Sequence, residues 1–271
     1  MQSYKSFIFI AYKKENHKNE NPGLVVIMEG KMYSVSKKIY ELTKSESETP
    51  EVQLVRLKAV DSSTMDFDAG MFAMISGIDK DTGKLYIGRA FSIASEPNSE
   101  EMEFYVVKEH GGHVSYFTTS KPGDKYQITG PYGQFKFVPE ENKKVLFIAG
   151  GTGFAPFMSM LRHIKKINAG TDVILIYSIK FPSEIIMKDE LMKLRDELGI
   201  KLLITVTRPQ EGDGWTGKTG HVNADMIKEA APDIDDRTTY VCGPLPFVQA
   251  IKNALVQLNV PQNEIRADVW G

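Results

Sequence analysis

The chain has 271 residues, of which 42% are hydrophobic and 25% are charged, and its formal net charge is −2. This length predicts two domains of roughly 100–200 residues in an ordinary soluble protein, which we expect in the cytoplasm. The slightly acidic balance argues against a nucleic-acid partner, and no apolar run approaches the roughly 20 residues of a membrane span. Cys242 is the only cysteine, which excludes an internal disulfide and a cysteine-ligated iron–sulfur cluster, and the five histidines show no metal-binding spacing.

The first segment, residues 1–48, is predicted to be a small appendage. Two apolar runs at 7–12 and 24–28 flank a polar stretch that contains Asn21-Pro22-Gly23, and this pattern favours a β-hairpin. Residues 44–50 are rich in charged and small polar side chains, and we interpret them as a solvated linker. A packing or subunit-contact role is expected here rather than chemistry.

Residues 49–140 show the pattern of an all-β domain. Short apolar or alternating runs recur between turn-rich joints, and several short strands at this spacing favour a sandwich or a small closed barrel. The strands are expected near residues 52–57, 71–75, 85–95, 102–108 and 125–129. One helical turn is expected at 111–117.

Residues 141–271 alternate between strand and helix patterns. Apolar runs without polar alternation indicate strands that are buried on both faces, as in parallel sheets. The strands are expected at 145–149, 172–178, 201–207, 239–242 and 264–270, with helices from 157, over 183–198 and through 247–255. This alternation predicts a doubly wound, Rossmann-like parallel sheet that binds ligands at the carboxyl ends of its strands.

A glycine-rich turn follows the first of these parallel strands. Gly150, Gly151 and Gly153 allow the backbone to approach a ligand closely, and Pro156 suits the first turn of the next helix. Free N–H groups and the positive end of the helix dipole make such a turn an anion site, so the predicted guest is a nucleotide phosphate. Because Pro156 stands where the fingerprint G-x-G-x-x-G has its third glycine, a plain tight turn is the alternative.

A second motif, Arg89-Ala90-Phe91-Ser92, lies in the predicted β domain. An arginine can bind phosphate oxygens with two parallel hydrogen bonds, a phenylalanine offers a face for a flat ring, and a serine hydroxyl both donates and accepts. Alternation along a strand puts Arg89 and Phe91 on one face and Ser92 on the other. An ordinary strand with a surface arginine is the alternative.

The order of β-barrel and α/β domain, with Arg89-x-Phe-Ser92, the glycine turn through Pro156 and Cys242-Gly-Pro244, resembles the ferredoxin–NADP reductase family over about residues 50–271. The resemblance implies an antiparallel Greek-key β-barrel that binds flavin, at 49–140, followed by the nucleotide domain at 141–271. It implies that Arg89 binds the flavin phosphates, Phe91 the ring and Ser92 the reactive N5 edge. Phenylalanine stands at position 91 where tyrosine is commoner in the family.

The family also uses a Gly-x-x-Ser segment for the FAD pyrophosphate, which Gly112 and Ser115 match, so FAD is favoured over FMN. The flavin-binding residues implied in this way are Arg89, Ala90, Phe91, Ser92, Val107, Lys108, Gly112, His113, Val114 and Ser115. The turn at 130–133 also matches the family and is interpreted as architectural.

In the second domain the resemblance implies a site for NADH or NADPH. The residues that it assigns are Gly151, Thr152, Gly153, Pro156, Thr207, Arg208, Cys242, Gly243 and Pro244. The Cys242 thiol is expected near the reacting nicotinamide carbon, where it acts by packing and orientation and not as a nucleophile. Thr207 and Arg208 match a pair that contacts the 2′-phosphate of NADPH, with Lys218 as a helper. NADH-using members can also carry arginine there, so both nucleotides stay open.

Trp270 resembles the terminal aromatic residue that covers the other face of the flavin in many members. It is the penultimate residue, followed by Gly271. A plain hydrophobic end to the last strand is the alternative interpretation.

The implied function is an FAD-dependent NAD(P)H oxidoreductase that passes hydride from nicotinamide to flavin and then single electrons to a protein acceptor. Ser92, Cys242 and Trp270 are expected at the reacting rings, and a ferredoxin or flavodoxin is the first acceptor implied by the resemblance. The alternatives are a reductase of free flavin, an electron-input subunit of a larger redox complex, and a non-catalytic module that senses NAD(P)H. The sequence leaves the acceptor, the nucleotide and the oligomeric state open.

Overall fold

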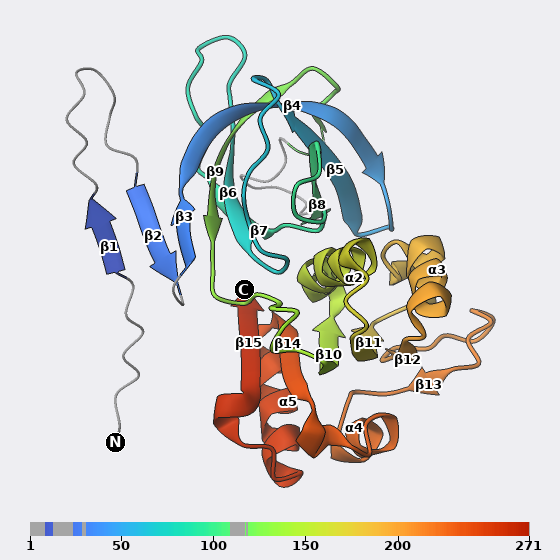
Figure 1. Cartoon of the computed structure of the whole chain (residues 1–271). Helices are drawn as coiled ribbons and strands as arrows, with labels where there is room; N and C mark the ends of the chain where they lie inside the picture. Colours follow the sequence, from blue (N-terminus) through green and yellow to red (C-terminus); the bar gives the residue numbers. More distant parts are fainter. Residues whose placement is uncertain (1–8, 13–23, 29–30, 109–116, 118, 271) are drawn as a thin grey trace.

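The computed structural model describes residues 9–12, 24–28, 31–108, 117 and 119–270 (Figure 1). Three sheets organise these residues: a three-stranded sheet, a six-stranded antiparallel sheet and a six-stranded parallel sheet. Most of the helical turn expected at 111–117 lies outside the described residues. No helix in the described part of the chain is long and apolar enough to cross a membrane.

The small sheet contains β1 (Phe9–Tyr12), β2 (Leu24–Met28) and β3 (Lys31–Ser34), in that order. β1 and β2 pair antiparallel, which confirms the predicted pairing of the two apolar runs. β3 continues the sheet on the other side of β2 and was not foreseen.

The antiparallel sheet forms the barrel at the top of Figure 1. Its strand order is β7-β6-β9-β4-β5-β8. The strands are β4 (Ser36–Ser47), β5 (Val52–Ala59), β6 (Phe72–Gly77), β7 (Arg89–Ser92), β8 (Glu101–Val107) and β9 (Lys125–Tyr132). The linker predicted at 44–50 is wrong over residues 44–47, because they continue β4 and pair with β5.

The parallel sheet has the order β13-β12-β11-β10-β14-β15, and every neighbouring pair is parallel. The strands are β10 (Lys144–Gly150), β11 (Asp172–Ile179), β12 (Lys201–Val206), β13 (Lys218–Thr219), β14 (Thr238–Pro244) and β15 (Ile265–Trp270). The helices are α2 (Ala155–Ile167), α3 (Lys188–Leu198), α4 (Ala224–Ala230) and α5 (Leu245–Gln257). The predicted doubly wound sheet is therefore confirmed.

The side chains of β10 show why both faces of this sheet are covered. Alternate residues of a strand point to opposite faces. Val145, Phe147 and Ala149 join the core under α2 and α3, whereas Leu146 and Ile148 join the core under α4 and α5. A run that is apolar on both faces therefore marks the central strand.

The helix predicted at 183–198 begins later in the structure. A short 3₁₀ turn, η2 (Pro182–Glu184), is followed by extended backbone, and α3 starts only after Met187, which has a left-handed φ of 49°. The Met187 N–H donates to the Glu48 carboxylate at 2.7 Å, from the far side of the domain boundary. A contact that local sequence does not encode therefore sets this helix start.

One buried apolar cluster contains residues of both the barrel and the parallel sheet. Phe135, which follows β9, packs edge-on against Phe157 of α2 at 5.7 Å and against Tyr240 of β14 at 5.4 Å between ring centroids. Ala69 and Tyr105 of the barrel belong to the same buried cluster. The boundary drawn near residue 140 thus runs through this cluster, whereas the interior of the barrel forms a second cluster of its own.

Candidate active site

A cavity of about 850 Å³ opens where the carboxyl ends of the parallel strands meet the barrel. This is the edge at which doubly wound sheets bind ligands. Seven of the residues assigned from the sequence line it: Val107, Gly151, Thr152, Thr207, Arg208, Pro244 and Trp270. The cavity therefore brings one of the barrel residues assigned from the sequence, Val107, together with most of the elements predicted to hold a pyridine nucleotide.

The glycine turn packs directly on β14. A Cβ atom on Gly153 would lie 2.4 Å from the carbonyl oxygen of Cys242, so only glycine permits this approach. Gly150 and Gly243 lie against the ring of Phe247, where added Cβ atoms would come within 2.8 and 2.7 Å of it. Gly151 has a φ of 55° and would find nothing within 4 Å of an added Cβ, so it borders open space.

The same turn leaves its backbone donors available. It forms a 3₁₀ turn, η1 (Gly151–Phe154), that leads into α2, and no side chain caps either element. Pro156 is in the first turn of α2 as predicted, and it is buried rather than exposed to the cavity. Uncapped N–H groups at the start of a helix form a site that accepts an anion, which is the property that a nucleotide phosphate requires.

Basic side chains gather just beyond the ends of β11, β12 and β13. The Arg208 N–H donates to the Lys180 carbonyl at 2.9 Å, which holds the ends of β12 and β11 side by side. Arg208, Lys180 and His221 are exposed and line the cavity, and no ion pair joins the Arg208 or Lys180 side chain to any described residue. The carboxylate of Glu184 lies on the same wall and accepts the Lys180 N–H at 3.0 Å. Lys218, predicted as a helper, instead pairs with Glu229 at 2.7 Å.

Cys242 is fully buried in β14, next to the glycine turn. Burial, reinforced by the charge of Asp268, raises the pKa of its thiol well above the ordinary value. Burial thus favours the protonated thiol, which suits the packing role that the resemblance implies. Asp268 lies opposite Cys242 in β15, and burial raises the pKa of its carboxyl as well.

Trp270 lies opposite Pro244 at the end of β15, and its side chain is 40% exposed. It lines the cavity, so the last aromatic side chain stands at the entrance to the predicted nucleotide site. That location is compatible with a ring that covers a cofactor.

The predicted flavin motif occupies β7, an edge strand of the barrel sheet. Arg89 and Ala90 are exposed, and the Arg89 guanidinium makes no hydrogen bond or ion pair with the described residues. Phe91 lies opposite the buried Ala73 and contacts Phe117 edge-on at 5.4 Å. Ser92 lies opposite Phe72, on the other face, as alternation predicts.

Other residues assigned to the cofactors lie elsewhere. The Lys108 ammonium donates to the carbonyl oxygens of Thr49 and Pro50 at 2.8 and 3.3 Å, so it braces the turn between β4 and β5. Gly153, Cys242 and Gly243 support the cavity from behind without lining it. Gly112, His113, Val114 and Ser115 lie outside the described residues.

Several cavity residues were missed from the sequence. They are Thr49, Glu51 and Val52 of the barrel, and Lys180, Glu184, His221, Pro246 and Phe247 of the parallel-sheet half. Lys180 was accessible to prediction, because it directly follows a parallel strand. Thr49 was not, because a turn between barrel strands carries no signal for a nucleotide.

The groups present fit a flavin and a pyridine nucleotide. The Thr49 hydroxyl is buried at the cavity wall without a hydrogen-bond partner among the described residues, as a group reserved for a ligand would be. Arg208 and Lys180 at the same cavity, and Arg89 on β7, carry positive charge that no described residue pairs with. Each is a donor that a phosphate can use.

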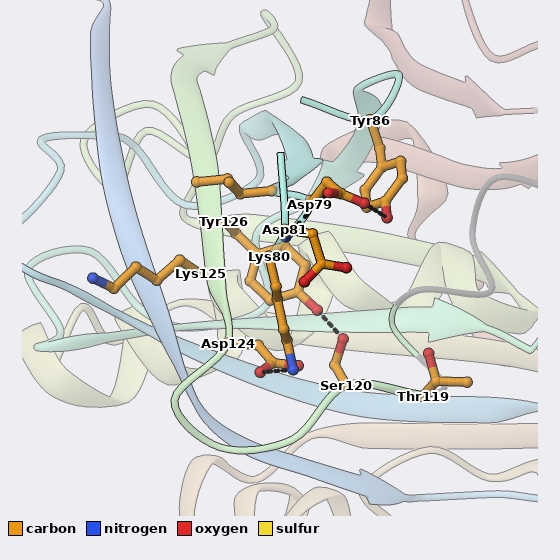
Figure 2. A pocket seen from close by; sticks show the side chains of 11 residues that line it. Asp79, Lys80, Asp81, Tyr86, Thr119, Ser120, Asp124, Lys125 and Tyr126 are labelled. Atoms are coloured by element: carbon orange, nitrogen blue, oxygen red, sulfur yellow. Dashed lines mark hydrogen bonds and ion pairs between the residues drawn. The ribbon is translucent and has the colours of Figure 1, made fainter. Parts of the chain in front are cut away.

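A second cavity, of about 250 Å³, lies beside the end of β6 and the start of β9 (Figure 2). Its polar side chains satisfy one another. Lys80 pairs with Asp124 at 2.8 Å, the Tyr86 hydroxyl donates to Asp79 at 2.8 Å, and Ser120 is hydrogen-bonded to Tyr126 (Figure 2). We therefore assign no ligand to it.

Comparison with known proteins agrees with this geometry. Residues 40–137 match the model of an oxidoreductase FAD-binding domain, and residues 147–253 match that of an oxidoreductase NAD-binding domain. The two domains in this order define the class of protein as an FAD- and NAD(P)-binding oxidoreductase. The chain belongs to the ferredoxin–NADP reductase-like family.

Two relatives and one solved structure illustrate the likeness. The chain is 33% identical over 171 residues to the glycine betaine monooxygenase reductase subunit of Pseudomonas aeruginosa, covering 62% of this chain and 47% of that protein. It is 34% identical over 195 residues to NADH-cytochrome b5 reductase 1 of Emericella nidulans, covering 69% and 61%. The chain thus spans less than two thirds of the length of these relatives. The flavohem-like FAD/NAD-binding domain of a Vibrio cholerae nitric oxide dioxygenase has the same fold, with a TM-score of 0.76 at 22% identity, over 86% of this chain and 98% of that one.

Proposed function

We propose that this chain is a reductase that oxidises NADH or NADPH, holds FAD, and delivers electrons to a protein acceptor. The observation that carries the proposal is the cavity whose walls come from both the barrel and the carboxyl ends of the parallel strands. A ligand bound there contacts both halves at once, as hydride transfer between two cofactors requires.

The residues divide the work between binding and orientation. Arg89 binds the flavin phosphates, and Phe91 and Ser92 lie along the ring. The glycine turn binds the nucleotide phosphates, and Arg208 with Lys180 holds the adenosine end. By packing against the glycine turn, Cys242 sets the distance between that turn and β14. Trp270 excludes water from the entrance of the cavity. Bound FAD supplies the chemistry of accepting a hydride and releasing single electrons.

A protein acceptor is favoured over a free small molecule. One relative is named as the reductase subunit of a monooxygenase, and another as a reductase of cytochrome b5. With one cysteine, this chain has no iron–sulfur cluster of its own to carry the electrons further. We propose a ferredoxin or a flavodoxin as the acceptor.

The flavin domain is proposed to begin at β4 rather than at residue 49. β4 lies between β5 and β9 in the barrel sheet, and the match to the FAD-binding model starts at residue 40. The remaining boundary, near residue 140, is proposed where the sequence places it, in the turn before β10.

The direct test is anaerobic reduction. The purified protein, reconstituted with FAD, is expected to show the absorption of oxidised flavin and to bleach when NADH or NADPH is added. Reduced ferredoxin, flavodoxin or cytochrome should then form in a coupled assay. A protein that binds neither FAD nor FMN contradicts the proposal, and bleaching without transfer to any protein favours a reductase of free flavin.

A non-catalytic NAD(P)H sensor makes a different prediction. Such a module binds the nucleotide but sustains no turnover with an artificial acceptor such as ferricyanide. Steady ferricyanide reduction by the FAD-loaded protein therefore separates the enzyme from the sensor.

A further inference from the structure

One helix connects the two cofactor motifs. α2 begins directly after the glycine turn, and its residues Ser159, Arg162 and Lys166, spaced by three and four, share a face. That face lies against residues 94–97, which follow β7 and its Phe91-Ser92 motif. Only Ile93 separates Ser92 from the first point of contact, Ala94, so α2 is joined to the chain directly beside the predicted flavin motif.

The contacts along this face are polar and directional. The buried Ser159 hydroxyl donates to the Ser95 carbonyl at 2.6 Å, and the Arg162 guanidinium donates to the Ala94 carbonyl at 2.9 Å. One turn further, the Lys166 ammonium lies 3.1 Å from the Glu96 carboxylate. The helix is thus joined to one short segment at three successive points.

Arg162 is the centre of this contact. Its side chain is 11% exposed and donates to Glu103 of β8 at 2.8 Å. Two further N–H groups donate to the two Glu190 oxygens of α3, both at 2.7 Å. Glu103 is 4% exposed and also accepts from Arg56 of the barrel at 2.8 Å. Two arginines and two glutamates therefore form a balanced cluster across the domain boundary, which is the arrangement that buried charges require.

The shared apolar core cannot fix orientation in the same way. Contacts between apolar side chains such as Phe135 and Phe157 have little directional preference, so they hold surfaces together while permitting small slides. A planar guanidinium that donates to three groups at fixed angles permits very little sliding. A displacement of about 1 Å at reacting groups can cost a factor of roughly 100 in rate.

We infer that Arg162 is a positioning residue for hydride transfer: through Glu103 and the Ala94 carbonyl it holds the glycine turn in register with the Phe91-Ser92 motif. This inference rests on the proposed function, because it presumes that the two motifs bind the two reacting cofactors. Arg162 does not line the nucleotide cavity and does not belong to β7, so it acts through α2 and segment 94–97.

The test compares two isosteric variants that weaken different sides of the cluster. Glu103→Gln weakens the contact across the boundary, whereas Glu190→Gln weakens only the contact between α2 and α3. For the FAD-loaded proteins, the flavin content, the affinity for oxidised nucleotide, the anaerobic rate of flavin bleaching and the long-wavelength charge-transfer absorbance are measured. Arg162→Lys and Arg162→Met complete the series. Ser159→Ala removes the hydrogen bond to the Ser95 carbonyl, and so weakens the contact across the boundary without removing a charge.

Glu103→Gln and Arg162→Met are expected to slow bleaching at least tenfold and to weaken the charge-transfer absorbance, with flavin content and nucleotide affinity within about twofold of wild type. Arg162→Lys should recover part of the rate, Ser159→Ala should lose about threefold, and Glu190→Gln should stay within twofold. If Arg162→Met does not fold, Glu103→Gln and Ser159→Ala decide the result.

Two outcomes overturn the inference alone: bleaching in Glu103→Gln and Ser159→Ala that is as fast as in wild type, or equal slowing in Glu103→Gln and Glu190→Gln. A wild-type protein that neither nucleotide bleaches overturns the proposed function, and this inference with it. Wild-type kinetics therefore distinguish the two failures.

Discussion

The two cofactor regions are built in different ways. In the parallel-sheet half, the candidate site is made of backbone: a glycine turn lies within van der Waals distance of β14, and three strand ends meet beside it. In the barrel half, the candidate site is made of side chains on β7, an edge strand of four residues whose first two are exposed. A site made of closely packed backbone has almost no room for added side-chain atoms. A site made of side chains loses affinity stepwise, as single groups are removed.

Each half is therefore vulnerable to a different kind of substitution. A change at the turn alters the position of the main chain and, with it, the stability of the central sheet. A change on β7 removes one interaction and leaves the fold in place. The predictions below separate these two behaviours.

The largest effect is expected for Gly153→Ala. The added Cβ would meet the Cys242 carbonyl at 2.4 Å, and neither backbone segment can move without disturbing the sheet. Urea unfolding should show a loss of about 3 kcal/mol, within the range of severe local strain, together with loss of flavin bleaching by NAD(P)H. Gly151→Asn is the control, because its Cβ meets nothing and asparagine tolerates a positive φ; it should cost less than about 1 kcal/mol. Equal stability of the two variants would contradict the close packing.

Arg89→Ala is expected to weaken FAD binding by roughly 10- to 100-fold, because a hydrogen bond to a charged group contributes about 1.5–3 kcal/mol. Thermal unfolding of the flavin-free protein should hardly change, since the side chain is exposed and unpaired among the described residues. Titration of flavin-free protein with FAD measures the effect. Arg89→Lys should recover part of the affinity, and a variant with wild-type affinity would show that this arginine does not bind the phosphates.

Arg208→Ala is expected to raise KM for NADPH about tenfold, equivalent to about 1.4 kcal/mol, and KM for NADH much less. The physical reason is that NADPH carries an additional phosphate, on the 2′ position of its adenosine ribose, for the Arg208 and Lys180 charges to attract. Steady-state kinetics with ferricyanide and each nucleotide provide the measurement. Lys218→Ala is the control, because Lys218 is paired with Glu229 and should change neither constant. Equal effects on both nucleotides would place Arg208 at a group that they share.

The smallest effect is expected in the pH dependence of the unfolding free energy, through Glu103 at the contact between the two halves. Burial alone would raise the pKa of Glu103, but the charge and hydrogen bonds of Arg162, and those of Arg56, outweigh burial and hold it below its ordinary value. A carboxyl whose pKa is lower in the folded protein stabilises the fold at pH values above its pKa in the unfolded chain, which is about 4.3. This stabilisation is lost as the pH falls through the pKa of the folded protein. The wild type should therefore lose more unfolding free energy than Glu103→Gln between pH 6 and pH 3.5. Parallel pH profiles would mean that folding leaves the pKa of Glu103 unchanged, and would contradict the lowered value.

The sequence predicted the regular parts of the fold because burial dictates their patterns. Residues 145–149 and 172–178 are apolar on both faces and form the central strands of the parallel sheet. All of β4 was missed because only Tyr40 and Leu42 of the strand are deeply buried, while its polar residues are held by neighbours on both sides. The start of α3 was misplaced because Glu48, remote in sequence, binds Met187.

The candidate site was predictable where strand ends and glycines mark it. Gly151, Thr207 and Arg208 follow parallel strands, and they line the cavity. Thr49 and Arg162 could not be found in this way, because their importance arises from partners far along the chain. An arginine on a helix has the same local pattern whether it faces solvent or, like Arg162, a glutamate 59 positions away.

The common core around Phe135 limits how this protein can be engineered. Many modular proteins can exchange one half for that of a relative, because the junction between their halves is thin and polar. Here the barrel places Phe135 against Phe157 and Tyr240, so a foreign nucleotide half would bring ill-fitting rings to that interior. A functional chimera would need α2 and the middle of β14 to be transplanted together with the barrel, and its natural crossover point therefore lies beyond the loop at residue 140.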